Sequence, residues 1–212
     1  MGRIAVVTAN LGSFDTQKPH VAQSVDCDYF NVLDKDFPPR LNSMTPRLQA
    51  RIVKTHMWQF APGYDYYLWV DSSCRLADVD SVKWFMERLG DKDIAVFKHP
   101  HRETVADEAN YLKLRLGIGC PYITPRYENE LIDEQLDEVN VGEELFASTA
   151  FIYKLSPKIK KTMRDWWYHI SRYHSIDQLS LPHCLIENEC SVEVIEDNYL
   201  KVKALEYVRQ RR

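Results

Sequence analysis

The chain has 212 residues, of which 45% are hydrophobic and 27% charged, a balance typical of globular rather than disordered proteins. A chain of this length can bury a sizeable core, and we expect one domain over residues 1–212, either whole or part of a longer multidomain protein. The formal net charge of −4 gives no overall attraction to nucleic acid or anionic membrane, so we expect no nucleic-acid partner.

The cysteine pattern and the absence of long apolar runs bear on the compartment. No run approaches the roughly 18 apolar residues of a membrane span, and the apolar stretch at the N-terminus is too short for a signal peptide. We therefore expect a cytoplasmic protein without a membrane span. Five widely spaced cysteines and no C-x-x-C pair favour reduced thiols and argue against structural zinc: Cys27, Cys74, Cys120, Cys184 and Cys190.

The first half of the chain alternates between short β-rich runs and helical patterns. Thr45 is a plausible helix N-cap with Pro46 at the first helical position, and Leu48 and Ile52 recur at helical spacing. Gly90 closes a later helical pattern. We expect strands at residues 3–10, 28–34 and 66–70 and helices at 45–60 and 79–90.

The second half continues the alternation. We expect strands at 93–99 and 148–154, and helices at 103–116, at 128–138 and from Pro157 onward, with a polar, helix-compatible segment at 203–212. Strands that alternate with helices predict an α/β fold with a central, largely parallel mixed sheet flanked by helices. In such sheets ligands bind outside the carboxyl ends of the strands, near a topological switch point.

Asp71 directly follows the apolar strand YYLWV and is the first candidate site residue. Two interpretations stay open: a helix cap or turn residue, or a ligand for a divalent cation such as Mn²⁺ or Mg²⁺, which prefer oxygen ligands. Ser73 beside it would be a weaker hydroxyl or water-mediated partner. Asp78 and Asp80 are explained more simply as acids in the first turn of a helix.

Several basic residues are candidates for binding phosphate. Arg47, Arg51 and Lys54 share one helix face, which is either a solvated surface or a face aimed at a nucleotide. Arg102 follows a strand, where a guanidinium can clamp a diphosphate with paired hydrogen bonds. A surface ion pair of Arg102 with a neighbouring acid is the alternative.

The remaining polar candidates are weaker. His99 and His101 form a lone His-x-His, a weak metal signal. Asp177 and Gln178 could together bind neighbouring sugar hydroxyls, although a helix cap also explains Asp177. His183 could reach a metal or an oxyanion, but the pattern favours a buried, satisfied histidine. Dinucleotide, P-loop, nucleophile-elbow and H-E-x-x-H motifs are absent from the sequence.

An ordered set of motifs resembles a known family: TPRLQARIVKTH, YLWVDSSCRL, KHPHRETVADEA, STAFIYK and DQLSL, between about Thr45 and Leu181. It is similar to a glycosyltransferase-like family whose plant members, once a domain of unknown function, are linked to cell-wall and mucilage polysaccharides. The resemblance implies a GT-A type (Rossmann-like) fold and a metal-dependent transferase that uses a nucleotide-diphosphate sugar, such as a UDP-sugar. Asp71 corresponds to the first acid of the family's D-x-D-like motif, whereas Ser73 departs from it at the second.

By position, the resemblance carries over Arg51, Lys54, His101, Arg102, Glu108, Asp177 and Gln178. The roles that follow, and the further residues named with them, are our hypothesis. The acceptor would be an oligosaccharide or glycoprotein, and the enzyme a hexosyl- or deoxyhexosyltransferase. Asp177 or Glu108 would be the catalytic base if the reaction inverts configuration. The cation would lie on Asp71, with Ser73 and His183 as further ligands. The donor would contact Thr8, Asn10, Gly12, Arg51, Lys54, His101, Arg102 and Gln178.

Two other functions compete with this one. A non-catalytic module that binds a nucleotide sugar or carbohydrate would explain Ser73 in place of the second acid. A sugar nucleotidyltransferase is the other alternative, and no glycine-rich phosphate loop supports it.

Overall fold

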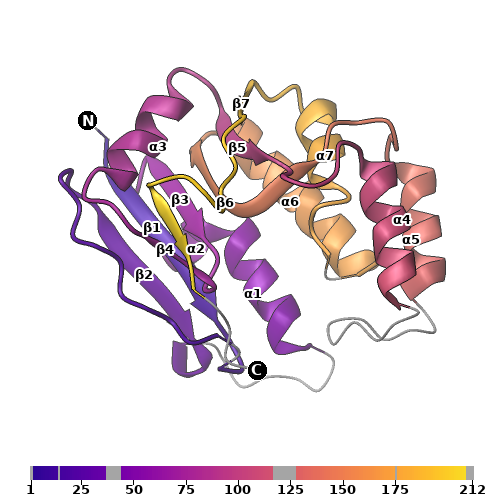
Figure 1. Cartoon of the computed structure of the whole chain (residues 1–212), viewed down its shortest axis with the longest axis horizontal. Helices are drawn as coiled ribbons and strands as arrows, with labels where there is room; N and C mark the ends of the chain where they lie inside the picture. Colours follow the sequence, from indigo (N-terminus) through magenta and orange to yellow (C-terminus); the bar gives the residue numbers. More distant parts are fainter. Residues whose placement is uncertain (1, 14, 37–43, 117–127, 175, 209–212) are drawn as a thin grey trace.

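A six-stranded sheet forms the centre of the structure, a computed structural model that describes residues 2–13, 15–36, 44–116, 128–174 and 176–208 (Figure 1). Within these residues β6 alone runs antiparallel to its sheet neighbours. The predicted α/β class and largely parallel mixed sheet are confirmed. In spatial order the strands are β2 (Asp28–Leu33), β1 (Ile4–Asn10), β3 (Tyr66–Val70), β6 (Phe146–Lys154), β5 (Ile94–Lys98) and β7 (Val192–Ile195).

Helices cover both faces of this sheet. One face packs against α1 (Pro46–Thr55), α2 (Met57–Phe60), α6 (Pro157–Arg172) and α7 (Leu181–Glu187). The other face packs against α3 (Ser81–Leu89) and a small sheet of β4 (Cys74–Leu76) and β8 (Leu205–Tyr207). The pair α4 (Val105–Leu116) and α5 (Glu128–Glu138) lies side by side at one end (Figure 1), and a short 3-10 helix spans Asp34–Asp36.

Alternation along the buried strands builds the two main core clusters. Val7 and Trp69 point to the α1 and α6 face, whereas Val6 and Leu68 point to the α3 face. Side chains of a strand point alternately to the two faces of the sheet, and here both faces are covered. The sequences of β1 and β3 are therefore continuously apolar. A third cluster joins α4 and α5 to the segment before α7.

The predicted helix signals operate as expected at α1 and α3. The Thr45 side chain accepts a hydrogen bond from the backbone N–H of Leu48, and Pro46 occupies the first helical position. Gly90 ends α3 with a φ of 53°, a left-handed conformation that favours glycine. The helix expected at 45–60 is divided at His56 into α1 and α2.

The C-terminal expectation was wrong. Residues 203–208 form no helix; they contain the strand β8, which pairs with β4 through a register that joins Cys74 to Tyr207. The partner strand lies about 130 residues away in sequence, so local pattern could not reveal it. Residues 209–212 of that predicted segment lie outside the described residues.

Two further findings bear on the expectations above. No helix in the described part of the chain is long and apolar enough to cross a membrane. Four cysteines carry free thiols, namely Cys27, Cys74, Cys184 and Cys190, while Cys120 lies outside the described residues.

Candidate functional site

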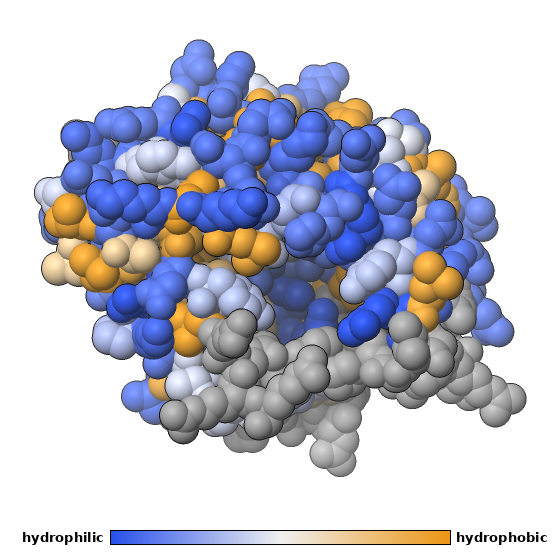
Figure 2. All heavy atoms as spheres, viewed as in Figure 1, coloured by the Kyte–Doolittle hydropathy of each residue, from blue (hydrophilic) through white to orange (hydrophobic). Residues whose placement is uncertain are grey.

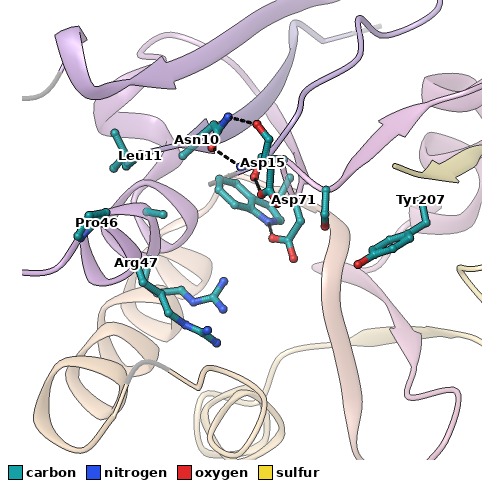
Figure 3. Close-up of a pocket in the computed structure, with 13 residues that line it drawn as sticks. Asn10, Leu11, Asp15, Pro46, Arg47, Asp71 and Tyr207 are labelled. Atoms are coloured by element: carbon teal, nitrogen blue, oxygen red, sulfur yellow. Dashed lines mark hydrogen bonds between the residues drawn. The ribbon is translucent and has the colours of Figure 1, made fainter. Parts of the chain in front are cut away.

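A cavity of about 350 Å³ opens at the carboxyl edge of the sheet, where the parallel strands β1 and β3 end. The first half of α1 forms its opposite wall, and Tyr207 of β8 reaches it from the far side (Figure 3). Figure 2 shows a hollow with hydrophilic walls near the middle of this face. The lining residues are Ala9, Asn10, Leu11, Asp15, Pro46, Arg47, Ala50, Arg51, Trp69, Asp71, Ser72, Ser73 and Tyr207.

Two carboxylates stand on the strand side of the cavity. Asp71 follows β3, and its Oδ1 accepts a hydrogen bond of 2.6 Å from the indole nitrogen of Trp69. Asp15 belongs to the loop after β1, and its carboxylate accepts a hydrogen bond from the Ser72 hydroxyl. The Asn10 side chain holds the Asp15 backbone, donating to its carbonyl and accepting from its N–H (Figure 3). Both acids are thus fixed by their neighbours.

The helix side of the cavity is basic. Arg47 and Arg51 lie four residues apart on α1, so both can face the same side. Arg51 also pairs with Asp177, with 3.0 Å between Nη1 and Oδ2. The cavity therefore has acidic groups on one wall and guanidinium groups on the other.

Lys54 follows on the same helix but is completely buried behind the cavity. Its ammonium nitrogen lies 2.6 Å from Oδ2 of Asp177, 3.1 Å from Oγ of Ser148 and 3.4 Å from Oδ1 of Asp71. Burial lowers the pKa of Lys54, and the nearby carboxylates of Asp177 and Asp71 oppose this shift. A buried lysine in this position is stable because each of its N–H donors meets an oxygen.

Asp177 is buried too, with a side chain only 5% exposed. Burial alone would raise the pKa of its carboxyl, but Arg51 and Lys54 outweigh that effect and hold the pKa well below its ordinary value. Its carbonyl accepts a hydrogen bond of 2.7 Å from the indole of Trp166. The helix-cap interpretation of Asp177 was wrong, because Ser180 is the residue that precedes α7.

For Asp71 the helix-cap interpretation was wrong, but the turn interpretation is confirmed, because its carbonyl accepts a hydrogen bond of 2.8 Å from the backbone N–H of Cys74. A turn and β4 follow Asp71, and the next helix begins only at Ser81. The backbone N–H of Asp71 bonds to the carbonyl of Thr149 on β6, so the residue stays attached to the sheet.

A second polar cluster follows β5. Arg102 forms an ion pair with Glu108 of α4, and its guanidinium also lies 4.1 Å from the centre of the Tyr111 ring. Burial raises the pKa of Glu108, although Arg102 opposes the shift. His99 accepts hydrogen bonds from the backbone N–H groups of His101 and Arg102, and burial lowers its pKa to about 4. The alternative for Arg102, a surface ion pair with Glu103 or Asp107, gives way to a pair with Glu108, in which Glu108 is buried and Arg102 partly exposed.

The structure brings together only part of the predicted site. Asn10, Arg51, Asp71 and Ser73 line the cavity, with Lys54 and Asp177 directly behind it. His101 and Arg102 line a different cleft, next to Glu196 and Asn198. Glu108 lies next to them through its pair with Arg102.

Four other predicted residues lie away from the cavity. Thr8 faces the opposite side of the sheet, in a pocket with His20 and Tyr29. Gly12 is exposed and donates its backbone N–H to the Asp34 carboxylate. Gln178 is half-buried, and His183 on α7 packs its ring edgewise against His169.

Asp15, Trp69 and Tyr207 are among the lining residues that were not predicted for the site, whereas Arg47 was a candidate for binding phosphate. Arg47 had a usable signal, since it shares a helix face with Arg51. Asp15 sits in an irregular loop and Tyr207 in a strand formed by distant pairing, so neither gave a local signal.

Protein ligands for a cation are few. Within the described residues no group of three or more His, Cys, Asp or Glu side chains is placed to hold a metal ion. Asp71 and Asp15 are the carboxylates of the cavity wall, with the hydroxyl-bearing Ser72 and Ser73 beside them. This donor set suits a hard cation that takes its other ligands from water and phosphate oxygens.

Comparisons with known proteins add one similarity. No family model matches the chain, and no curated protein matches it. Among solved structures it is similar to a glycosyltransferase involved in the glycosylation of the major capsid of PBCV-1, with 6% identity, a TM-score of 0.46, and coverage of 91% of this chain and 81% of that one.

Proposed function

We propose that the cavity binds a nucleoside diphosphate sugar, most simply a UDP-sugar, and that the protein transfers the sugar to a glycan or glycoprotein acceptor. One observation carries the proposal: Asp71 and Asp15 face Arg47 and Arg51 across a single cavity at the carboxyl edge of the sheet. Carboxylates that can hold a cation opposite guanidinium groups that can pair with phosphate oxygens suit a metal–diphosphate. The cavity volume of about 350 Å³ lies within the range of small-molecule sites.

A divalent cation, Mn²⁺ or Mg²⁺, would be held by Asp71 with Asp15 and the Ser73 hydroxyl as neighbours. When bound, such a cation supplies Lewis-acid stabilisation for the leaving nucleoside diphosphate. Oδ1 of Asp71 is engaged by Trp69 and Lys54, and no described residue donates a hydrogen bond to Oδ2. Oδ2 is therefore available to bind a cation, which supports the role of Asp71 as a cation ligand. His183 packs against His169 instead of lining the cavity, so we do not include it in this site.

The arginines would bind the diphosphate. Arg47 and Arg51 project from the first turns of α1, and a guanidinium can form paired, charge-assisted hydrogen bonds with phosphate oxygens. Their charge would stabilise the developing negative charge on the leaving group, in a cavity that excludes part of the solvent. Arg102 and His101 lie in the cleft after β5, which we assign to the sugar or acceptor side.

The two predicted catalytic carboxylates differ in their suitability as a proton acceptor. Asp177 is an ion-paired carboxylate with a depressed pKa, so it is a poor base. Burial raises the pKa of Glu108, which makes it the better proton acceptor once Arg102 is displaced or engaged elsewhere. We therefore propose Glu108, rather than Asp177, for an inverting reaction.

A donor screen read by nucleotide release would test the proposal. The purified protein is incubated with a panel of UDP-, GDP- and TDP-sugars, with Mn²⁺, Mg²⁺ or a chelator. We expect release of the nucleotide from one donor, dependent on the cation and lost in Asp71→Asn. The matched control is Asp91→Asn, which changes an exposed acid just after α3 and should leave release unchanged.

A non-catalytic binding module is the second candidate, favoured by Ser73 at the position of the second acid. Such a protein would bind a nucleotide sugar at the same cavity yet release no nucleotide. Cation-dependent binding without release from any donor in the panel would favour the module. Absence of both binding and release would exclude the two candidates together.

A further inference from the structure

Lys54 is the central residue of a buried polar network behind the cavity. An ammonium group has three N–H donors, and three oxygens surround this one: those of Asp71, Asp177 and Ser148. Lys54 has no exposed surface and does not line the cavity. All three N–H groups of Lys54 are therefore used inside the protein. A direct contact with a phosphate of the nucleotide sugar would require breaking one of these hydrogen bonds.

The network joins four separate parts of the fold. Lys54 comes from α1, Asp71 follows β3, and Ser148 lies on β6. Asp177 belongs to the segment before α7. Aromatic rings enclose the ammonium nitrogen, with the ring centres of Trp69 and Trp166 at 5.5 and 5.9 Å. Charge interactions in such a dry, aromatic environment are stronger than at the surface.

The network fixes the orientation of the Asp71 side chain. Its Oδ1 accepts from two donors, the indole of Trp69 at 2.6 Å and the ammonium of Lys54 at 3.4 Å. Asp71 keeps 28% of its side chain exposed, and it lines the cavity. With Oδ1 held from behind, Oδ2 is the oxygen left to meet a ligand.

We propose that Lys54 is a positioning residue: it holds Asp71 with one oxygen turned into the protein and the other presented to the cavity. Asp177 is the buried counter-ion of Lys54. We assign it this role instead of the role of catalytic base. Lys54 thus acts on the ligand through Asp71, and not as a phosphate ligand. The link between Lys54 and Asp71 is a property of the protein alone, whereas its effect on a cation and nucleotide rests on the proposed function.

The variant Lys54→Met tests this, because methionine keeps an unbranched side chain of similar length and removes all three donors. The matched control is Val53→Ala, the preceding residue on α1, which is also fully buried and packs in the core. The first measurement is the ¹H–¹⁵N indole resonance of Trp69 in ligand-free protein, assigned by its absence in Trp69→Phe. The second is the affinity for UDP in the presence of Mn²⁺, measured by calorimetry.

We expect Lys54→Met to shift the Trp69 indole resonance and to weaken Mn²⁺-dependent binding of UDP about 10- to 100-fold, as changes in residues that orient metal ligands do. Val53→Ala should leave both unchanged even if it lowers the melting temperature. A resonance and an affinity equal to wild type in Lys54→Met would overturn the proposal.

Failure of the proposed function gives a different result. If wild type binds no UDP with Mn²⁺, the function is wrong, and the indole resonance of ligand-free Lys54→Met still decides whether Lys54 positions Asp71. If Lys54→Met does not fold, the double variant Lys54→Met/Asp177→Asn is compared with Asp177→Asn alone. This pair isolates the ammonium group in a background without its counter-ion, and an unshifted indole resonance there contradicts the proposal.

Discussion

The indole nitrogen of Trp69 donates a hydrogen bond of 2.6 Å to Oδ1 of Asp71, two residues further along the chain. Trp69 is 2% exposed and packs in the core cluster beneath α1 and α6. Because alternate residues of an extended segment share a side, the ring can anchor in the core while its nitrogen reaches the carboxylate. The position of the acid is thus set by one of the most rigid parts of the fold.

Replacing that donor should weaken ligand binding. In Trp69→Phe an aromatic ring remains but the indole N–H is lost, so Lys54 is the one donor to Asp71 Oδ1 left among the described residues. We expect affinity for UDP with Mn²⁺ to fall about 10- to 100-fold, as for a lost hydrogen bond to a charged group. Calorimetry measures this, with Trp84→Phe on α3 as the control, because Trp84 packs on the other face of the sheet. Equal affinities in the two variants would contradict the role of Trp69.

Ser73→Asp should strengthen cation binding. Ser73 lines the cavity two residues after Asp71, so the variant would add a carboxylate to a wall that already holds Asp71 and Asp15. We expect Mn²⁺ to bind about tenfold more tightly in the presence of UDP, since carboxylates are preferred ligands of such cations. Manganese titration followed by electron paramagnetic resonance reads this directly. A weaker or unchanged cation affinity would place the cation elsewhere.

Tyr207 should contribute an aromatic surface to nucleotide binding. It lines the cavity from β8 and is 46% exposed, so its ring is accessible to a ligand. Tyr207→Ala should weaken UDP binding by about 1–3 kcal/mol if a base stacks on the ring, whereas Tyr207→Phe should bind nearly as wild type. Calorimetry on both variants separates loss of the ring from loss of the hydroxyl. An alanine variant that binds normally would remove Tyr207 from the site.

Asp177 should make stability depend on acid pH. Its pKa is depressed in the folded state, so its ionised form stabilises the fold above its unfolded pKa of about 3.9, and this contribution is lost as pH falls toward the lower folded pKa. In Asp177→Asn the charges of Lys54 and Arg51 lose their shared partner, and we expect a loss of about 3 kcal/mol at neutral pH.

Urea denaturation at several pH values measures both effects. The free energy of unfolding of the wild type should fall as pH falls from about 4 toward 2. That of the Asn variant should change less over the same interval. Asp91→Asn, an exposed change, serves as the control. If the free energies of unfolding of wild type and Asp177→Asn changed in parallel with pH, the ion pairs of this carboxylate would not stabilise the fold.

The sequence could predict most of the fold, for identifiable physical reasons. The runs at β1, β3 and β5 are continuously apolar because the sheet is covered on both faces, and such runs are hard to mistake. Thr45 and Pro46 mark the start of α1 with a cap that acts locally. The strand β8 could not be foreseen, because its pairing with β4 depends on a partner far away in the sequence.

The site was predictable where a residue type and a local pattern coincide. Asp71 directly follows an apolar strand, and Arg51 shares a helix face with Arg47 and Lys54. The burial of Lys54 could not be foreseen, because lysine is almost always exposed unless it is paired, and its partner Asp177 lies 123 residues further on. Asp15 gave no signal either, since its contact with Ser72 exists only after folding.

One titration tests the central claim most directly: UDP is added to the wild-type protein and to Asp71→Asn in a calorimeter, with Mn²⁺ and again with a chelator. The account predicts that wild type binds UDP with Mn²⁺, that the chelator weakens this binding strongly, and that the Asn variant binds weakly with or without the cation. Binding by Asp71→Asn that equals wild type and keeps its dependence on Mn²⁺ would contradict the account.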